Sequence, residues 1–181
     1  MMKPLSFLAS SCLTLSCLIL AAPSQAASVS FETPAIAGSG CSFGSFSYST
    51  KSIKNGQVLT LRTNGFRARP GNVTCNLALP VKVPNGYRVT EIHGVYSGYA
   101  KGRAELRRSY FLAGDTNPIL VSQWISSTGR VFTQLDKTKL KARCGEDVNV
   151  RLNSRLRTTT SASSARISAM LFTVHYTKCT S

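Results

Sequence analysis

Lysines and arginines at alternate positions give this sequence its clearest chemical pattern. A β-strand turns successive side chains to opposite faces, so cations two residues apart line up on one face. Such groups bind phosphate, sulfate and carboxylate, and arginine does so through two parallel hydrogen bonds. Three segments carry clustered cations, and these are the candidate polyanion-binding residues: Lys137, Lys139, Lys141 and Arg143; Arg151, Arg155 and Arg157; and Arg103, Arg107 and Arg108.

The whole chain is strongly basic, with 22 Lys and Arg against 7 Asp and Glu and a formal net charge of +15. Charges of one sign oppose folding by mutual repulsion and attract anionic partners. We therefore expect the partner to be an anionic polysaccharide, a lipid headgroup or another polyanion. Sequence-specific DNA recognition is not expected, because no helix-based reading motif appears. The competing interpretation is a solvated charged face that only keeps an exported protein soluble.

Residues suited to catalysis are scattered. His93 and His175 lie far apart in the sequence and outside any metal-binding motif, and no nucleophile elbow or phosphate-binding glycine loop occurs. We therefore predict a non-enzymatic domain without cofactor or metal. Two alternatives stay open: a carbohydrate-binding module that stacks sugars on Trp124, Tyr96 and Tyr99, and a hydrolase whose site is assembled from distant residues.

The first 26 residues have the features of a secretory signal peptide. Lys3 precedes an apolar stretch over 5–22, Pro23 ends that stretch, and Ser24-Gln25-Ala26 places small residues where a signal peptidase cleaves. The stretch is rich in serine and too short for a transmembrane helix. We therefore expect cleavage after Ala26 and one domain over residues 27–181, located outside the cell or in the periplasm.

Four cysteines remain in that domain, and an even number in an exported chain predicts two disulfide bonds. They are Cys41, Cys75, Cys144 and Cys179. Structural zinc sites usually take their cysteines in close pairs, and these four are widely spaced. The spacing therefore argues against a zinc site.

The hydrophobic pattern has the period of strands. Apolar or aromatic residues alternate with polar ones over 46–50, 75–81 and 148–156, and the turn pairs Asn55-Gly56 and Asn85-Gly86 bound such segments. Only 100–111 carries a helical pattern, and it is short and has no clear cap. These features predict an all-β fold, an antiparallel β-sandwich or related barrel.

The expected strands also suggest which cysteines pair. A hairpin of 148–157 with 166–178 would bring Cys144 and Cys179 together at its open end. A three-strand meander over 42–83 would do the same for Cys41 and Cys75. Among the three connectivities we therefore favour Cys41–Cys75 and Cys144–Cys179.

Several short motifs in a fixed order resemble a known family. They are Ala37-Gly38-Ser39-Gly40-Cys41, Cys75-Asn76-Leu77-Ala78-Leu79, Pro84-Asn85-Gly86-Tyr87, Gly98-Tyr99-Ala100 and Cys144-Gly145. In this order the chain resembles the small secreted proteins grouped as domain of unknown function 4360. The resemblance implies secretion, a single domain and a β fold. It implies no activity and no catalytic residues.

Overall fold

The computed structural model describes residues 28–42, 44–53 and 56–180. Within these residues the chain folds into ten strands and no helix. The strands are β1 (Ser30–Phe31), β2 (Ala35–Ala37), β3 (Phe46–Ile53), β4 (Gly56–Thr63), β5 (Arg67–Ala68), β6 (Gly71–Lys82), β7 (Tyr87–Leu112), β8 (Ile119–Lys139), β9 (Val148–Thr158) and β10 (Ser164–Lys178). The expected signal peptide lies outside the described residues.

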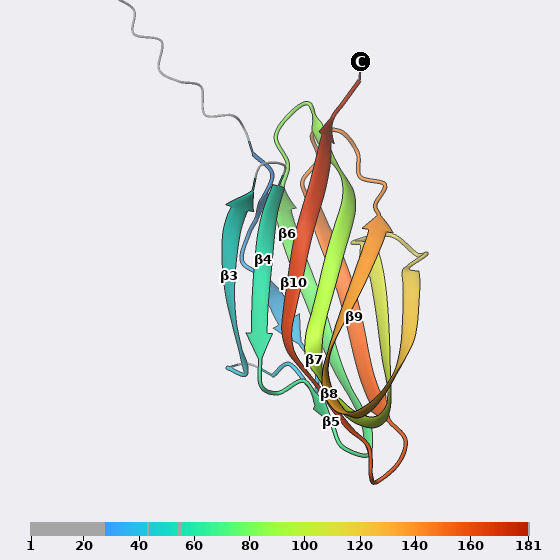
Figure 1. Ribbon diagram of the computed structural model, residues 1–181. Helices are drawn as coiled ribbons and strands as arrows, with labels where there is room; N and C mark the ends of the chain where they lie inside the picture. Colours follow the sequence, from blue (N-terminus) through green and yellow to red (C-terminus); the bar gives the residue numbers. More distant parts are fainter. Residues whose placement is uncertain (1–27, 43, 54–55, 181) are drawn as a thin grey trace, which may run out of the picture.

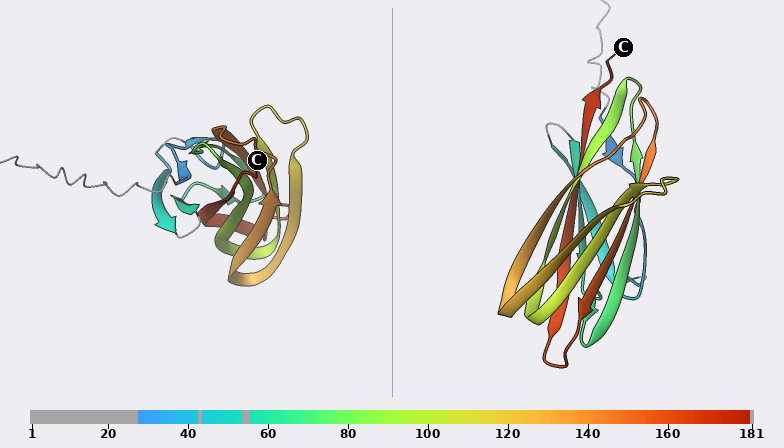
Figure 2. Two further views of the ribbon diagram at one scale, coloured as in Figure 1. Left: turned by 90° about the horizontal axis from the view of Figure 1, so that it is seen from above. Right: turned by 90° about the vertical axis from the view of Figure 1, so that its right-hand side faces the viewer.

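All strand pairs are antiparallel, and the sheet curls into a flattened, nearly closed barrel (Figures 1 and 2). The strand order is β1-β6-β9-β7-β10-β4-β3, with β2 beside β6, β5 beside β10 and β8 beside β7. The predicted all-β sandwich or barrel is therefore confirmed. The segment 100–111, which carried the helical pattern, lies within β7.

Two long strands, β7 and β8, form a hairpin that runs through both layers of the sandwich. The first half of β7 pairs with β10 over Tyr87–Lys101, and its second half pairs with β9 over Ala104–Leu112. We call the layer of β3, β4, β5, β10 and the first half of β7 the first layer. The layer of β1, β2, β6, β9 and the second half of β7 is the second layer. Strand β8 follows β7 along both layers.

Glycines allow the hairpin to bend between the layers. Gly102 in β7 has a φ of 74° and Gly129 in β8 has a φ of 105°, both in the region that favours glycine. The pairing register also shifts here, so that Ala100 faces Arg130, Lys101 faces Thr128 and Gly129 is an extra residue. A Cβ atom on Gly102 would lie 2.4 Å from the Ser163 hydroxyl oxygen. A side chain at this position would therefore strain the bend.

Alternating apolar residues from both layers fill the interior. Leu59, Leu61 and Phe172 from the first layer and Leu77, Leu79 and Leu152 from the second are fully buried or nearly so. Each such side chain contributes about 1.5–3 kcal/mol relative to an exposed one. This core holds the two layers face to face and leaves the polar side of each strand on an outer face.

The interior also contains an ion pair and its hydrogen-bond network. Arg108 of β7 and Asp136 of β8 are 2% and 5% exposed, and two guanidinium nitrogens lie 2.7 Å from the two carboxylate oxygens. The Tyr110 hydroxyl donates to the same carboxylate, and the Tyr96 hydroxyl lies 3.1 Å from the Ser154 hydroxyl. Arg108 lies in the second layer, whereas Asp136 pairs with Gly94 of the first. The pair therefore connects the two layers.

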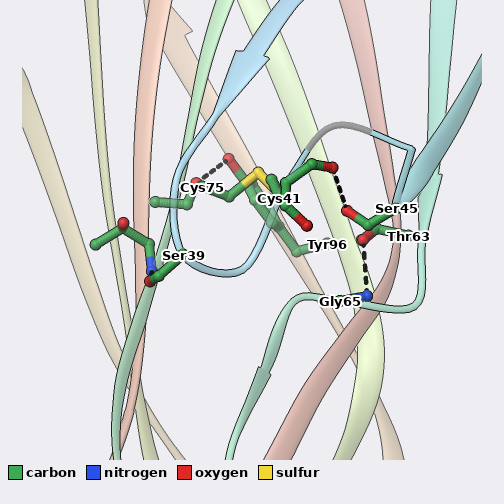
Figure 3. The surroundings of a disulfide bond; sticks show 10 residues. Ser39, Cys41, Ser45, Thr63, Gly65, Cys75 and Tyr96 are labelled. Atoms are coloured by element: carbon green, nitrogen blue, oxygen red, sulfur yellow. Dashed lines mark hydrogen bonds between the residues drawn. A yellow bond between two sulfur atoms is a disulfide. The ribbon is translucent and has the colours of Figure 1, made fainter.

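Both disulfides have the predicted connectivity. Cys41–Cys75 attaches the segment after β2 to β6 (Figure 3). Next to this disulfide the Gly40 amide donates to the Thr74 carbonyl. Cys144–Cys179 joins the segment between β8 and β9 to the segment that follows β10. Each cross-link spans a loop of about 35 residues, worth roughly 3–4 kcal/mol in the chain-entropy model. Two disulfides are typical of an oxidising compartment.

The strand pairings that suggested these disulfides are partly wrong. β9 and β10 do not form a hairpin, because each pairs with a different half of β7. β3 and β4 do pair, but β6 lies in the other layer, so the expected meander over 42–83 is absent. The cysteines still meet through other contacts: β2 pairs with β6 just before Cys41, and the amides of Gly145 and Cys179 donate to the neighbouring carbonyls of Tyr87 and Gly86. No helix among the described residues is long and apolar enough to span a membrane.

The buried ion pair yields a test of the fold. Replacing Arg108→Met leaves the Asp136 charge buried without its main partner, and we expect it to lower the free energy of unfolding by about 3–5 kcal/mol. The double variant Arg108→Met/Asp136→Asn removes both charges and should be more stable than Arg108→Met alone. Urea unfolding measures both values. A double variant less stable than Arg108→Met would show that the ion pair is not the source of the effect.

Candidate functional site

Strand register gathers five of the predicted arginines on the outer face of the second layer. Across the β7–β9 pair Glu105 faces Arg157, Arg107 faces Arg155 and Phe111 faces Arg151. Arg103 lies on the same side of β7, two residues before Glu105. We call this surface the arginine face, and its cations are Arg103, Arg107, Arg151, Arg155 and Arg157.

Glu105 is the acidic residue at the centre of the arginine face. It is only 3% exposed and accepts hydrogen bonds from the Arg107 guanidinium and the Ser122 hydroxyl. Burial by itself raises the pKa of this carboxyl, but the hydrogen bonds and the positive charges of Arg107 and Arg157 outweigh it and lower the pKa. Glu105 therefore stays ionised and orients arginines, which makes it a poor proton donor for catalysis.

Trp124 borders the arginine face from β8, where it pairs with Glu105. Trp124 is 46% exposed, so it lies outside the core. The Arg103 guanidinium carbon lies 4.0 Å from the centre of the indole ring. This cation–π contact fixes the arginine over the ring and orients both groups at the rim of the face.

Two shallow hollows lie side by side on the arginine face. One, of about 200 Å³, is lined by residues that include Thr74, Arg107 and Arg155. The other, of about 180 Å³, includes Arg151. Both are also lined by Asn76 and Asn153, which face each other across β6 and β9. Together they place guanidinium groups on either side of a pair of amides.

The arginine face holds charges that the fold itself does not satisfy. Arg155 lies directly opposite Arg107, and like charges in that position destabilise a sheet. The Nε of Arg155 is buried and has no hydrogen-bond partner among the described residues. An anion bound here would relieve the repulsion between Arg107 and Arg155.

The remaining predicted cations lie elsewhere. Lys137 and Lys139 are on the second half of β8, where they face His93 and Glu91 of the first layer. Lys141 and Arg143 follow the end of β8, and Arg143 lies 3.9 Å from the Glu146 carboxylate. These four residues belong to a different part of the surface from the arginine face.

Two residues singled out in the sequence are buried and leave the candidate set. Arg108 was a predicted anion ligand, but its guanidinium is occupied by Asp136 in the interior. Tyr96 was part of the proposed sugar platform, but it is fully buried. Tyr99 lies on the first layer, where it faces Arg166 of β10. The three aromatic residues therefore do not form one platform.

The structure reveals a histidine pair that the sequence did not suggest. The His93 Nε2 atom lies 3.0 Å from the Glu91 carboxylate, and its Nδ1 atom lies 3.1 Å from Nε2 of His175. Burial and the neighbouring His93 lower the pKa of His175, and the hydrogen bond from His93 lowers the pKa of Glu91. Glu91, His93 and His175 lie on the outer face of the first layer, beside Lys137. They do not line the two hollows of the arginine face.

Within the described residues no group of three or more His, Cys, Asp and Glu side chains is arranged to hold a metal ion. The histidine pair and Glu91 form a hydrogen-bonded chain on the surface of the sheet.

The lowered pKa of His175 predicts a pH-dependent stability. Between its pKa in the folded protein and its unfolded value near 6.5, the unfolded chain binds more protons, so stability falls as the pH drops below about 6.5. We expect His175→Gln to reduce the loss of unfolding free energy between pH 7.0 and 5.5, as measured by urea denaturation. Equal losses in the variant and the native protein would contradict this assignment.

Several solved structures with some similarity are carbohydrate-binding modules. TmCBM61 in complex with beta-1,4-galactotriose has a TM-score of 0.37 and 10% identity, covering 82% of this chain and 90% of that one. The module CBM6cm-2 from Cellvibrio mixtus lichenase 5A, in complex with cellotriose, has a TM-score of 0.34 and 12% identity, covering 72% and 87%. The family 11 module from Clostridium thermocellum has a TM-score of 0.30 and 7% identity, covering 83% and 95%.

These TM-scores are all below 0.5, so the similarities assign neither a detailed fold nor a function. The chain matches no curated protein sequence. A family model does match, over residues 27–178, which is nearly all of the chain beyond the expected signal peptide. The chain therefore belongs to the family described as Domain of unknown function (DUF4360).

Proposed function

We propose that the protein is a secreted, non-enzymatic domain that binds an acidic polysaccharide through the arginine face. The observation that carries the proposal is the strand register, which brings arginines from two segments about fifty residues apart in sequence onto one surface. Their only acidic neighbour across the β7–β9 register is Glu105, which Arg107 already engages.

The side chains on this face suit a sugar polymer that carries carboxylate or sulfate groups. Arginine offers paired donors to such groups, and the amides of Asn76 and Asn153 can both donate to and accept from sugar hydroxyls. The adjoining hollows share these amides and have an arginine on each side. A chain lying across them would meet charged and neutral hydrogen-bonding groups alternately.

A lipid headgroup is a weaker match to the arginine face. Its cations lie along the middle of a sheet, and amide side chains accompany them, whereas membrane-binding surfaces combine cations with apolar groups that enter the bilayer. Trp124 and Leu120 of β8 are exposed at one side of this face only. We therefore place lipid binding among the outcomes of the test.

A non-enzymatic role follows from the chemistry of the face. Glycoside hydrolysis requires two carboxyl groups in distinct protonation states. The arginine face presents Glu105, whose pKa is lowered and whose oxygens are engaged by Arg107 and Ser122. Binding without cleavage is the activity that these groups support.

Binding to heparin, used as a model acidic polysaccharide, tests the proposal. We expect Arg107→Gln/Arg155→Gln/Arg157→Gln to weaken the affinity at least about tenfold in roughly 0.1 M salt, because three charge-assisted contacts are lost. Added salt should weaken binding of the native protein steeply. Isothermal titration calorimetry at several salt concentrations measures both effects.

The matched control is Lys137→Gln/Lys139→Gln/Lys141→Gln, which removes the same charge from the end of β8 and the segment just after it. It should weaken binding much less than the triple arginine variant. Equal losses would show that net charge alone attracts heparin and would overturn the assignment to the arginine face. Salt-insensitive binding that disappears in Trp124→Ala would instead support recognition of neutral sugars, and tighter binding to anionic vesicles than to heparin would support a lipid partner.

A further inference from the structure

A second cluster of arginines lies on the outer face of the first layer. Arg166 of β10 faces Arg67 of β5 on one side and Tyr99 of β7 on the other. Arg69 follows directly after β5. The three arginines and Tyr99 line a hollow of about 250 Å³, together with Ser164 and Ala165. We call it the Arg166 hollow.

The Arg166 hollow lacks acidic partners. No carboxylate lines it, and none of its three arginines forms an ion pair with the described residues. Arg67 and Arg166 stand directly opposite each other on paired strands, which costs stability through like-charge repulsion. The fold therefore brings three arginines to the lining of one small hollow and pairs none of them with a carboxylate of the described residues.

Neighbouring groups restrain these arginines. The Arg166 guanidinium carbon lies 5.9 Å from the centre of the Tyr99 ring, which holds a cation near its face. The Tyr99 hydroxyl reaches across the bend of the hairpin and would lie 2.8 Å from a Cβ atom placed on Gly129. The missing side chain at Gly129 thus leaves room for the Tyr99 ring to form one wall of the hollow.

We propose that the Arg166 hollow binds one compact tetrahedral oxyanion, a sulfate or phosphate group carried as an ester. A planar carboxylate presents two oxygens and suits a single guanidinium fork, whereas a tetrahedral ester presents three oxygens that can accept from three arginines. Ser164 adds a hydroxyl donor. The volume leaves space for the group that carries the ester, packed against the Tyr99 ring.

This site is independent of the arginine face. The two surfaces lie on opposite layers of the sandwich, and they share no residue. The arginine face is an open surface with two shallow hollows, whereas the Arg166 hollow is a single hollow lined by three arginines. The proposed function can therefore fail while this proposal stands, and the reverse is also true.

Nuclear magnetic resonance titrations of the native protein test the proposal. Inorganic sulfate and inorganic phosphate should shift the ring signals of Tyr99 and the Arg166 side-chain Nε–H signal, and acetate should bind at least about tenfold more weakly. Galactose 6-sulfate and glucose 6-phosphate then distinguish a sulfate ester from a phosphate ester as the ligand. Equal binding of acetate, or no shift at Tyr99 with any of these anions, would overturn the proposal.

Two matched variants locate the site. Arg166→Gln should weaken sulfate and phosphate binding at least about tenfold, whereas Arg88→Gln removes an exposed charge from the same layer near the start of β7 and should leave it unchanged. Arg155→Gln on the arginine face should leave the anion-induced shifts of Tyr99 and Arg166 unchanged. An equal loss in Arg88→Gln would mean that these anions respond to net charge alone and would overturn the proposal. If Arg166→Gln does not fold, Arg67→Gln serves the same purpose.

Discussion

The buried contact between Arg108 and Asp136 connects the two layers of the sandwich through a single bent hairpin. A buried ion pair is stable only when its partners are well oriented and otherwise satisfied, and here Tyr110 and the Leu106 carbonyl supply further hydrogen bonds. This geometry requires β7 and β8 to bend at Gly102 and Gly129. The bend in turn determines which strand each half of β7 meets, and thereby which side chains share an outer face.

The distribution of charge follows from that bend. Because the second half of β7 pairs with β9, Arg107 comes to lie beside Arg155. Because the first half pairs with β10, Tyr99 comes to lie beside Arg166. The two cationic surfaces are thus products of one hairpin, and each collects like charges that repel. The apolar core and two disulfides offset that repulsion, which explains how so basic a small domain can fold.

The sequence predicted most of the strands from their alternation, and it predicted the disulfide connectivity although the strand pairings behind that prediction were partly wrong. It placed the cations of the arginine face in two separate segments, because their shared face depends on the long-range pairing of β7 with β9. It could not show that Arg108 is buried, because only the long-range pairing of β7 identifies which side of that strand faces the core. In the structure the even-numbered residues of β7 from Ile92 to Tyr110, Arg108 among them, point inward. The same limit applies to Tyr96 and to the failed hairpin of β9 and β10. The Arg166 hollow was missed because Arg67, Tyr99 and Arg166 meet only through long-range strand pairing.

Mapping the arginine side chains in the bound state tests the account most directly. Nuclear magnetic resonance spectra of the Nε–H groups, recorded with and without a short heparin oligosaccharide, report each guanidinium separately. The account predicts that signals of Arg107, Arg155 and Arg157 shift together while that of Arg88 does not. Shifts confined to Arg143 and its neighbours at the end of β8, or none on the second layer, would contradict it.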